Sequence, residues 1–414
     1  MAQKNRRNRS RRYRPYQERY VSPKTKWTIA LSILGALLIG AVVLALLQGW
    51  IKLPERPEKP VETTVATEPP EDTVIHFVAG GDVNITDKVV AAGGGAYDYS
   101  AMLMDVLPIL SNGDLTAVNF EGNVCGEPYG ASLHSAPQQL LTALCNAGVD
   151  VLQTANSQAI TNGLRGLAAT NSAIRNAKMQ PLGTYASKEE FNRYKGYLLY
   201  EINGVRVALV SFTKGMDGRN LPEGNENSVN LLYKDYGSTY REINTEGITS
   251  ILNAVADAQP DITIAMLHWG SEYNDTINPT QQKICQLLQS LGVDAIIGSH
   301  PHYVQKMGFD AETGLFVAYS LGDLCGDADI NGTDYSVLLD LEITKNGATG
   351  ETTITGFDYT PLYLYHDPVG GLRVLRINEA IAAYENHNIN RVSDEVYAAM
   401  VTALARIQAR VNAT

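Results

Sequence analysis

The longest apolar stretch of the chain covers residues 27–51 and contains no charged side chain. At 1.5 Å per residue, a helix of this length crosses the hydrocarbon core of a bilayer, which is about 30 Å thick. Trp27 and Trp50 stand near its two ends, where aromatic residues commonly anchor a helix in the membrane interface. The pattern therefore predicts one transmembrane helix over residues 27–51.

The residues around this stretch predict its orientation. Residues 1–26 hold ten Lys and Arg and one Glu, so this basic arm carries +9. The positive-inside rule places such an arm in the cytoplasm. We therefore expect a single-pass protein of the cell membrane whose C-terminal domain is extracellular. A cleaved signal peptide is the alternative, which the length of the apolar run disfavours. Residues 52–73 are rich in Pro, Glu and Thr and predict an extended stalk.

From residue 74 to residue 326, short apolar runs with the composition of strands alternate with longer amphipathic runs. Helical patterns over residues 138–148 and 281–292 each lead through Gly-Val-Asp into an apolar strand, and a helical run near 244–258 leads into another. Helices of this length between β-rich runs are typical of βαβ units and a mainly parallel sheet. The sequence thus predicts an α/β domain over residues 74–326.

The pattern changes in residues 327–414. Two alternating runs flank Asn346-Gly347, a dipeptide that favours a tight hairpin turn. A final helix is predicted to begin after Ser393, whose side chain is a good N-cap. We expect this region to form a β-hairpin and a helix packed on the domain.

The net charge of the chain limits the kinds of molecule that it is expected to bind. The chain carries −11, and because the basic arm carries +9, the remaining residues carry −20. An acidic body repels phosphates, which argues against a nucleic-acid partner, whereas the arm suits an anionic lipid surface.

The four cysteines allow three disulfide pairings, and their spacing does not predict a structural zinc site. They are Cys125, Cys145, Cys285 and Cys325.

Five predicted strands end in residues that bind metals. In an open α/β sheet, ligands bind outside the carboxyl ends of the strands, so we expect these residues to converge. Carboxylates, an amide and imidazoles suit one or two divalent cations such as Mn, Fe or Zn. The residues are Asp82, Glu121, Asn156, His268, and His300 with His302.

Each of these residues also has an ordinary interpretation. In an extended segment His300 and His302 point the same way and face one ion, but a polar loop would also contain them. His268 by itself is more often a hydrogen-bonded structural residue. Glu272 is either a residue that orients an imidazole or a solvated loop residue. Asn156 either binds a metal or contacts a substrate.

The motifs that contain these residues occur in a characteristic order. They are GGD at 80–82, NFE at 119–121, the segment 155–167, HWGSEY at 268–273, GSHPH at 298–302 and YSLGD at 319–323. As an ordered set they resemble the CapA/PgsA family of capsule-synthesis proteins linked to poly-γ-glutamate, whose domain is similar to calcineurin-like metallophosphoesterases. The resemblance spans residues 75–325. Sequence signatures of serine hydrolases and P-loop enzymes are lacking.

The resemblance implies a metallophosphoesterase-type layered sandwich and a set of metal ligands. These ligands would be Asp82, Glu121, His268, His300 and His302. One motif departs from the family pattern, which is close to A-N-N-H. Here Ser157 stands where the family has a metal-binding Asn, Gln158 stands in place of the catalytic His, and Thr161 replaces an Asp. The loss of that imidazole removes the proton donor that hydrolysis would use, so catalytic residues stay unassigned.

Three functions remain open. The first is a membrane-anchored CapA-like protein that serves synthesis, export or anchoring of an anionic surface polymer, with a divalent-metal site and with the membrane, the polymer or other capsule-synthesis proteins as partners. The second is an active metal-dependent hydrolase of phosphoesters or of the polymer. The third is a non-catalytic scaffold of the cell envelope.

Overall fold

The computed structural model describes residues 23–50, 70–367, 371–388 and 392–413. The chain divides into two units, Met1–Glu68 and Pro69–Thr414. Most of the basic arm and of the stalk lies outside the described residues. The helices are α1 (Pro23–Leu47), α2 (Asp87–Ala92), α3 (Ser100–Leu103), α4 (Leu107–Leu110), α5 (Gln138–Asn146), α6 (Gly163–Asn176), α7 (Lys188–Tyr194), α8 (Thr245–Asp257), α9 (Pro279–Ser290), α10 (Ile377–Glu385) and α11 (Asp394–Val411), with 3₁₀ turns η1 (Gly94–Ala96) and η2 (Glu226–Ser228).

The first unit contains one apolar helix, α1. Its 25 residues give a length of about 38 Å. Large apolar side chains such as Trp27, Leu38 and Leu47 are exposed on it. The segment Ala30–Leu47 is long and apolar enough to cross a membrane. This confirms the predicted N-terminal apolar helix, by length and composition.

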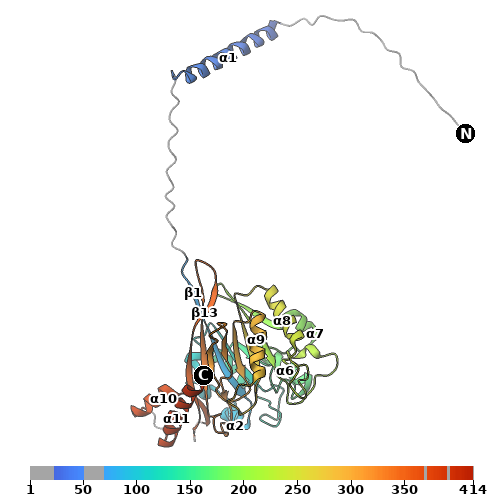
Figure 1. Cartoon of the computed structure of the whole chain (residues 1–414), viewed down its shortest axis with the longest axis vertical. Coiled ribbons are helices and arrows are strands. Elements are labelled where there is room, and N and C mark those ends of the chain that lie inside the picture. The colour runs from blue at the N-terminus through green and yellow to red at the C-terminus, as the bar shows by residue number, and fades with distance from the viewer. Residues whose placement is uncertain (1–22, 51–69, 368–370, 389–391, 414) are drawn as a thin grey trace, which may run out of the picture. The chain divides into compact units, whose positions relative to one another are not determined.

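The second unit contains two sheets (Figure 1). The first sheet has the order β14-β13-β12-β1-β2-β3-β4, with β11 also paired to β1, and the second has the order β5-β6-β7-β8-β10-β9. The strands are β1 (Thr73–Asn84), β2 (Leu115–Glu121), β3 (Val151–Gln153), β4 (Gln180–Leu182), β5 (Tyr197–Ile202), β6 (Val205–Thr213), β7 (Ile262–His268), β8 (Ala295–Ser299), β9 (Met307–Phe309), β10 (Phe316–Ala318), β11 (Asp323–Cys325), β12 (Tyr335–Lys345), β13 (Thr352–Asp367) and β14 (Gly371–Arg376).

The alternation of side chains along the strands builds three apolar layers. Phe77 of β1 and Leu209 of β6 belong to the core between the sheets, while their neighbours Val78 and Ala208 pack outward. The outer face of the first sheet is covered by α3 to α6, and that of the second by α8 and α9. This helix–sheet–sheet–helix arrangement confirms the predicted layered α/β sandwich.

The C-terminal strands differ from expectation in two ways. They do not merely pack on the domain, because β12 is hydrogen-bonded to β1 within the first sheet. The turn between β12 and β13 is also not a tight Asn-Gly turn but a loop over residues 346–351, in which the Asn346 side chain accepts hydrogen bonds from the backbone of Ala348 and Thr349. Ser393 caps α11 as predicted, and α10 and α11 close one end of the core between the sheets (Figure 1).

Candidate metal centre

The five predicted ligands come from the strand ends of both sheets, not from one sheet as the strand pattern suggested. Asp82 lies near the end of β1 and Glu121 at the end of β2, in the first sheet. His268 ends β7 in the second sheet, and the other two histidines follow β8. All are at most 3 % exposed, and they are Asp82, Glu121, His268, His300 and His302. The packing of the two sheets therefore assembles the site.

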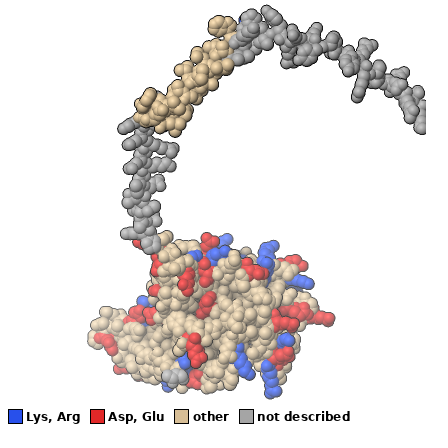
Figure 2. Space-filling model, turned by 45° about the horizontal axis from the view of Figure 1, so that its top comes forward, with Lys and Arg blue, Asp and Glu red and all other residues tan. Residues whose placement is uncertain are grey.

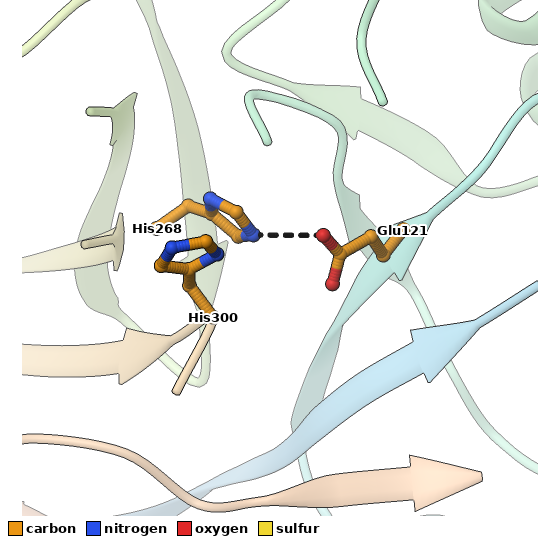
Figure 3. Close-up of side chains that lie close together, drawn as sticks. All are labelled: Glu121, His268 and His300. Carbon is orange, nitrogen blue, oxygen red and sulfur yellow. Dashed lines mark hydrogen bonds and ion pairs between the residues drawn. The ribbon is translucent and has the colours of Figure 1, made fainter. Parts of the chain in front are cut away.

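One cluster is formed by Glu121, His268 and His300 (Figure 3). His268 Nε2 lies 3.2 Å from Glu121 Oε1, and the His268 and His300 rings lie with their centroids 4.4 Å apart. One potential ligand atom from each of the three residues lies within 4.8 Å of the others. These separations suit three ligands around a single ion.

A second cluster is formed by Asp82, Glu121 and His302, and it shares Glu121 with the first. Asp82 Oδ1 accepts a hydrogen bond of 2.6 Å from the Asn119 amide, and its Oδ2 accepts one of 3.1 Å from the His300 backbone N–H. His302 Nδ1 lies 3.4 Å from Asp82 Oδ2. A carboxylate common to two clusters is what a site for two neighbouring cations requires.

The spacing of the two paired histidines predicted an extended segment, but the structure does not place them in a strand. β8 ends at Ser299, and His300 and His302 have φ angles of +94° and +57°. Such left-handed conformations strain residues with a side chain and persist where the surrounding structure requires them. The bend sends the rings to different clusters, with centroids 6.2 Å apart. His300 thus belongs to the first cluster and His302 to the second, while both also group with Glu272.

The carboxyl groups of this centre are protonated more easily than usual. Burial raises the pKa of Asp82 to about 7, and the charge of Glu121 adds to the effect. Burial also raises the pKa of Glu121 to about 7. Two buried carboxylates next to each other are costly when both are charged, unless a cation neutralises them.

The histidines of the centre differ in their charge. Burial lowers the pKa of His268 to about 3 and that of His300 well below its usual range, so both rings are neutral. Burial would lower the pKa of His302 as well, but the charge and hydrogen bond of Asp323 raise it well above its usual range. Neutral imidazole is the form that binds a metal. His268 and His300 are thus ready to ligate, whereas His302 must first lose a proton.

Two polar atoms at the centre have no hydrogen-bond partner among the described residues. They are Glu121 Oε2 and His300 Nδ1, both buried. Buried polar atoms almost always have a partner, because losing contact with water is costly. A cation bound by these atoms would supply that missing interaction. Carboxylate and imidazole together fit Zn, Mn or Fe.

The two additional predicted site residues lie close by in different roles. The Asn156 side chain donates hydrogen bonds to Asn119 and Phe120 and accepts one from the Gln158 backbone, so it holds the ends of two strands together. Glu272 is exposed, and its Oε1 lies 4.0 Å from His300 Nδ1. Glu272 groups with both paired histidines in a third cluster.

Gln158 does not take the catalytic role that a histidine would have at this position. Its side chain donates to Asp217 Oδ2 at 3.1 Å and accepts a hydrogen bond from the Thr161 hydroxyl. The amide nitrogen and oxygen are therefore both occupied by hydrogen bonds to neighbouring side chains. An amide does not release a proton at neutral pH, so this position offers no general acid.

Two residues that adjoin the centre were not assigned a role from the sequence. Asp323 Oδ1 lies 2.7 Å from His302 Nδ1, and Lys214 Nζ lies 3.3 Å from His300 Nε2. Lys214 comes directly after strand β6, as the other candidates come at the ends of their strands, whereas Asp323 begins β11 after Gly322 in YSLGD. Application of the strand-end rule to every apolar run would have found Lys214.

The comparison with known protein families agrees with the ordered motifs. Residues 76–328 match the model of the bacterial capsule synthesis protein family PGA_cap. The chain belongs to the PGA_cap family. Every residue of the two clusters falls within the matched part of this PGA_cap protein.

Two relatives of this PGA_cap chain are capsule proteins of Bacillus. The chain is 27 % identical over 262 residues to the capsule biosynthesis protein CapA of Bacillus anthracis, with 61 % of this chain and 60 % of that protein covered. It is 26 % identical over 261 residues to the PGA biosynthesis protein CapA of Bacillus subtilis, with 61 % and 63 % covered. The match thus spans less than two thirds of each relative's length.

Solved structures similar to the PGA_cap chain include phosphoesterases. The calcineurin-like phosphoesterase YfkN from Bacillus subtilis is 15 % identical, with a TM-score of 0.43 and 81 % of this chain and 99 % of that chain covered. A novel phosphatase from Mycoplasma pneumoniae is 13 % identical, with a TM-score of 0.42 and 70 % and 94 % covered.

Proposed function

We propose that this protein is a membrane-anchored CapA-like protein that serves the synthesis, export or anchoring of an anionic surface polymer of the poly-γ-glutamate type, and that it carries a divalent-metal site outside the cell. The observation that carries the proposal is the convergence of Asp82, Glu121, His268, His300 and His302 in two clusters that share Glu121. Membership in a capsule-synthesis family supports the polymer.

The proposed metal ligands are supported by charge and by geometry. The two carboxylates have raised pKa values because they are buried together, and two buried atoms of Glu121 and His300 lack hydrogen-bond partners in the described part of the chain. One or two ions of Mn, Fe or Zn would satisfy both features. When bound, such a cation attracts anionic groups and polarises their oxygen atoms.

The proposed location rests on α1 and on the basic arm before it. The helix is long and apolar enough to span a bilayer, and the positive-inside rule puts residues 1–26 in the cytoplasm. We propose that residues 27–51 are retained as an anchor, that residues 52–73 form a stalk, and that residues 74–326, with the C-terminal strands and helices of residues 327–414, form the extracellular body. Protease added to intact cells should then degrade the body and spare the arm.

Metal analysis of the purified full-length protein tests the centre. The wild type should retain Mn, Fe or Zn after dialysis, and His300→Ala should lose most of it. His387→Ala is a matched control, because His387 is exposed and distant in sequence from the clusters. Wild-type protein that holds no such metal, or a His300→Ala variant with full metal content, would contradict the site.

Polymer production tests the role of the centre in the cell. Cells that lack the gene should regain surface polymer when they receive the wild type but not when they receive a variant with alanine at all five proposed ligands. An intact polymer coat in cells with the five-alanine variant, together with its loss when α1 is deleted, would favour the scaffold function instead.

A further inference from the structure

A small cavity opens beside the first cluster. Its volume is about 230 Å³, and its walls include His300, Lys214, Ser157, Tyr240 and Glu272. A water molecule occupies about 30 Å³ of liquid, so the cavity accommodates a single ionised group with a short carbon chain, not a folded partner. It is the space that a ligand of a cation bound at His300 would occupy.

Lys214 is fixed in the wall of this cavity by several contacts. Its backbone N–H donates to the His268 carbonyl at 2.8 Å, which ties the residue to the end of β7. Its ammonium donates to the Gly270 carbonyl at 2.8 Å and lies 4.8 Å from the centre of the Tyr240 ring. A long side chain is ordered here at a cost in conformational entropy, which these contacts offset.

Among the described residues, the ammonium of Lys214 forms no ion pair with a carboxylate, although Asp217 and Glu272 line the same cavity. Of the two acids in the cavity wall, Asp217 pairs with Arg219 at 3.5 Å and Glu272 lies 4.0 Å from His300. In the part of the chain that the structure describes, no ion pair includes Lys214. A half-buried ammonium without a direct ion pair has capacity to bind an anion.

We propose that the cavity is an oxyanion subsite, in which Lys214 and the cation of the neighbouring cluster together bind one carboxylate or phosphate group of the ligand. This inference rests on the proposed metal centre. It locates the positive charge that an anionic polymer needs on a body that, together with the stalk, carries −20. Figure 2 shows acidic side chains interspersed with basic ones over the drawn face of that body.

The subsite depends on the cation because two acidic side chains also line the cavity. Without a metal ion, the single charge of Lys214 stands against Asp217 and Glu272, so the cavity does not favour anions. A divalent ion at His300 reverses that balance. Oxyanion binding should therefore require both the metal and Lys214.

Binding of two small probes to the full-length protein in detergent tests the subsite. Inorganic phosphate represents a phosphoester, and glutarate represents a polymer carboxylate. Calorimetry on manganese-loaded wild type should detect at least one probe, and Lys214→Met should weaken that probe about tenfold, which is typical for loss of a charged hydrogen bond. Lys283→Met, which removes an exposed lysine of α9, should bind like the wild type. The probe that binds more tightly identifies the ligand group.

Metal content and melting temperature of the same samples separate the two proposals. Lys214→Met should keep its manganese and its melting temperature. Equal binding of the probes by metal-loaded wild type and Lys214→Met, or binding of neither probe by the wild type, would overturn the subsite and leave the metal centre standing. Loss of manganese in Lys214→Met would mean that Lys214 positions His300 for the metal, and it would also overturn the subsite. A wild type without metal would refute both.

Discussion

His268 Nε2 lies 3.2 Å from Glu121 Oε1, although 147 residues separate them in the sequence. Glu121 ends β2 in the first sheet and His268 ends β7 in the second. The pair thus joins the two sheets at the edge where the other proposed ligands gather. A cation bound between them would be held by both layers, so metal binding and the packing of the sheets should be linked.

Glu121→Gln should separate the metal contribution to stability from the cost of a buried charge. Burial raises the pKa of Glu121 from 4.5 to about 7, so between these values the folded metal-free protein holds more protons than the unfolded chain and loses stability as pH rises. At pH 8 that cost is on the order of 3 kcal/mol. Without metal, the variant should therefore melt at a higher temperature than the wild type, in thermal unfolding at pH 8.

Addition of metal should reverse that order. A ligand at a thousand times its Kd stabilises the folded state by about 4.1 kcal/mol, which exceeds that cost, and the variant should gain much less because it lacks a charged ligand. Glu351→Gln, which neutralises an exposed acid, should follow the wild type under both conditions. A Glu121→Gln variant that gains as much from metal as the wild type would show that Glu121 is not a ligand.

Metal affinity should increase with pH. Asp82 and Glu121, with pKa values of about 7, must lose their protons to bind a cation, so affinity should rise by about tenfold per pH unit for each proton released below pH 7. His302, whose pKa is raised by Asp323, should extend a weaker rise above pH 7. His268 is neutral throughout and adds no dependence. Competition with a chromogenic chelator from pH 5.5 to 8.5 measures this, and a flat profile would contradict these protonation states.

Asp323→Asn should weaken the metal centre through His302. The carboxylate lies 2.7 Å from His302 Nδ1 and fixes the ring beside Asp82. Loss of the residue that orients a metal-bound histidine typically costs 10- to 100-fold in metal affinity, so we expect a decrease of about that size. Chelator competition measures it at pH 8. Asp329→Asn, at an exposed position in the following loop, is the control and should leave affinity unchanged.

The strand pattern predicted much of this centre because of a simple regularity. Polar residues stand at the ends of several buried strands, and the apolar runs before Asp82, Glu121 and His268 are distinct enough to locate those ends. The pattern could not show that the strands belong to two sheets, because pairing depends on contacts between residues far apart in the sequence. Nor could it show the left-handed backbone at His300 and His302, which the neighbouring structure imposes.

The residues that the sequence did not assign are those whose role is to contact other side chains. Asp323 matters because it meets His302, and Lys214 because it lies beside His300. Neither role is visible in local spacing. Asn156 shows the reverse case, since its position suggested a ligand and the structure gives its amide four hydrogen bonds to the protein.

The double substitution Ser157→Asn/Gln158→His tests whether hydrolysis has been lost at this site. It restores the amide and the imidazole of the family pattern, and general acid–base catalysis contributes about 10² to 10⁴ in rate. We expect the wild type to show no metal-dependent turnover of bis(p-nitrophenyl) phosphate and the double variant to gain it. Robust turnover by the wild type that depends on added metal would instead favour the hydrolase function. Ser157→Ala/Gln158→Ala should stay inactive.

Gly81→Ala should disrupt the first strand end, because the site depends on close packing of backbones. A Cβ at Gly81 would lie 1.8 Å from the Gly322 carbonyl oxygen, which accepts the hydrogen bond from the Asp82 backbone N–H. Overpacking of this kind costs about 1–3 kcal/mol, so chemical unfolding should show a loss of that size together with weaker metal binding as Asp82 shifts. Gly95→Ala is the matched control, since a Cβ there meets no atom within 4 Å. It should change the free energy of unfolding by less than about 0.5 kcal/mol. Equal effects of the two substitutions would show that the backbone contact at Asp82 does not shape the centre.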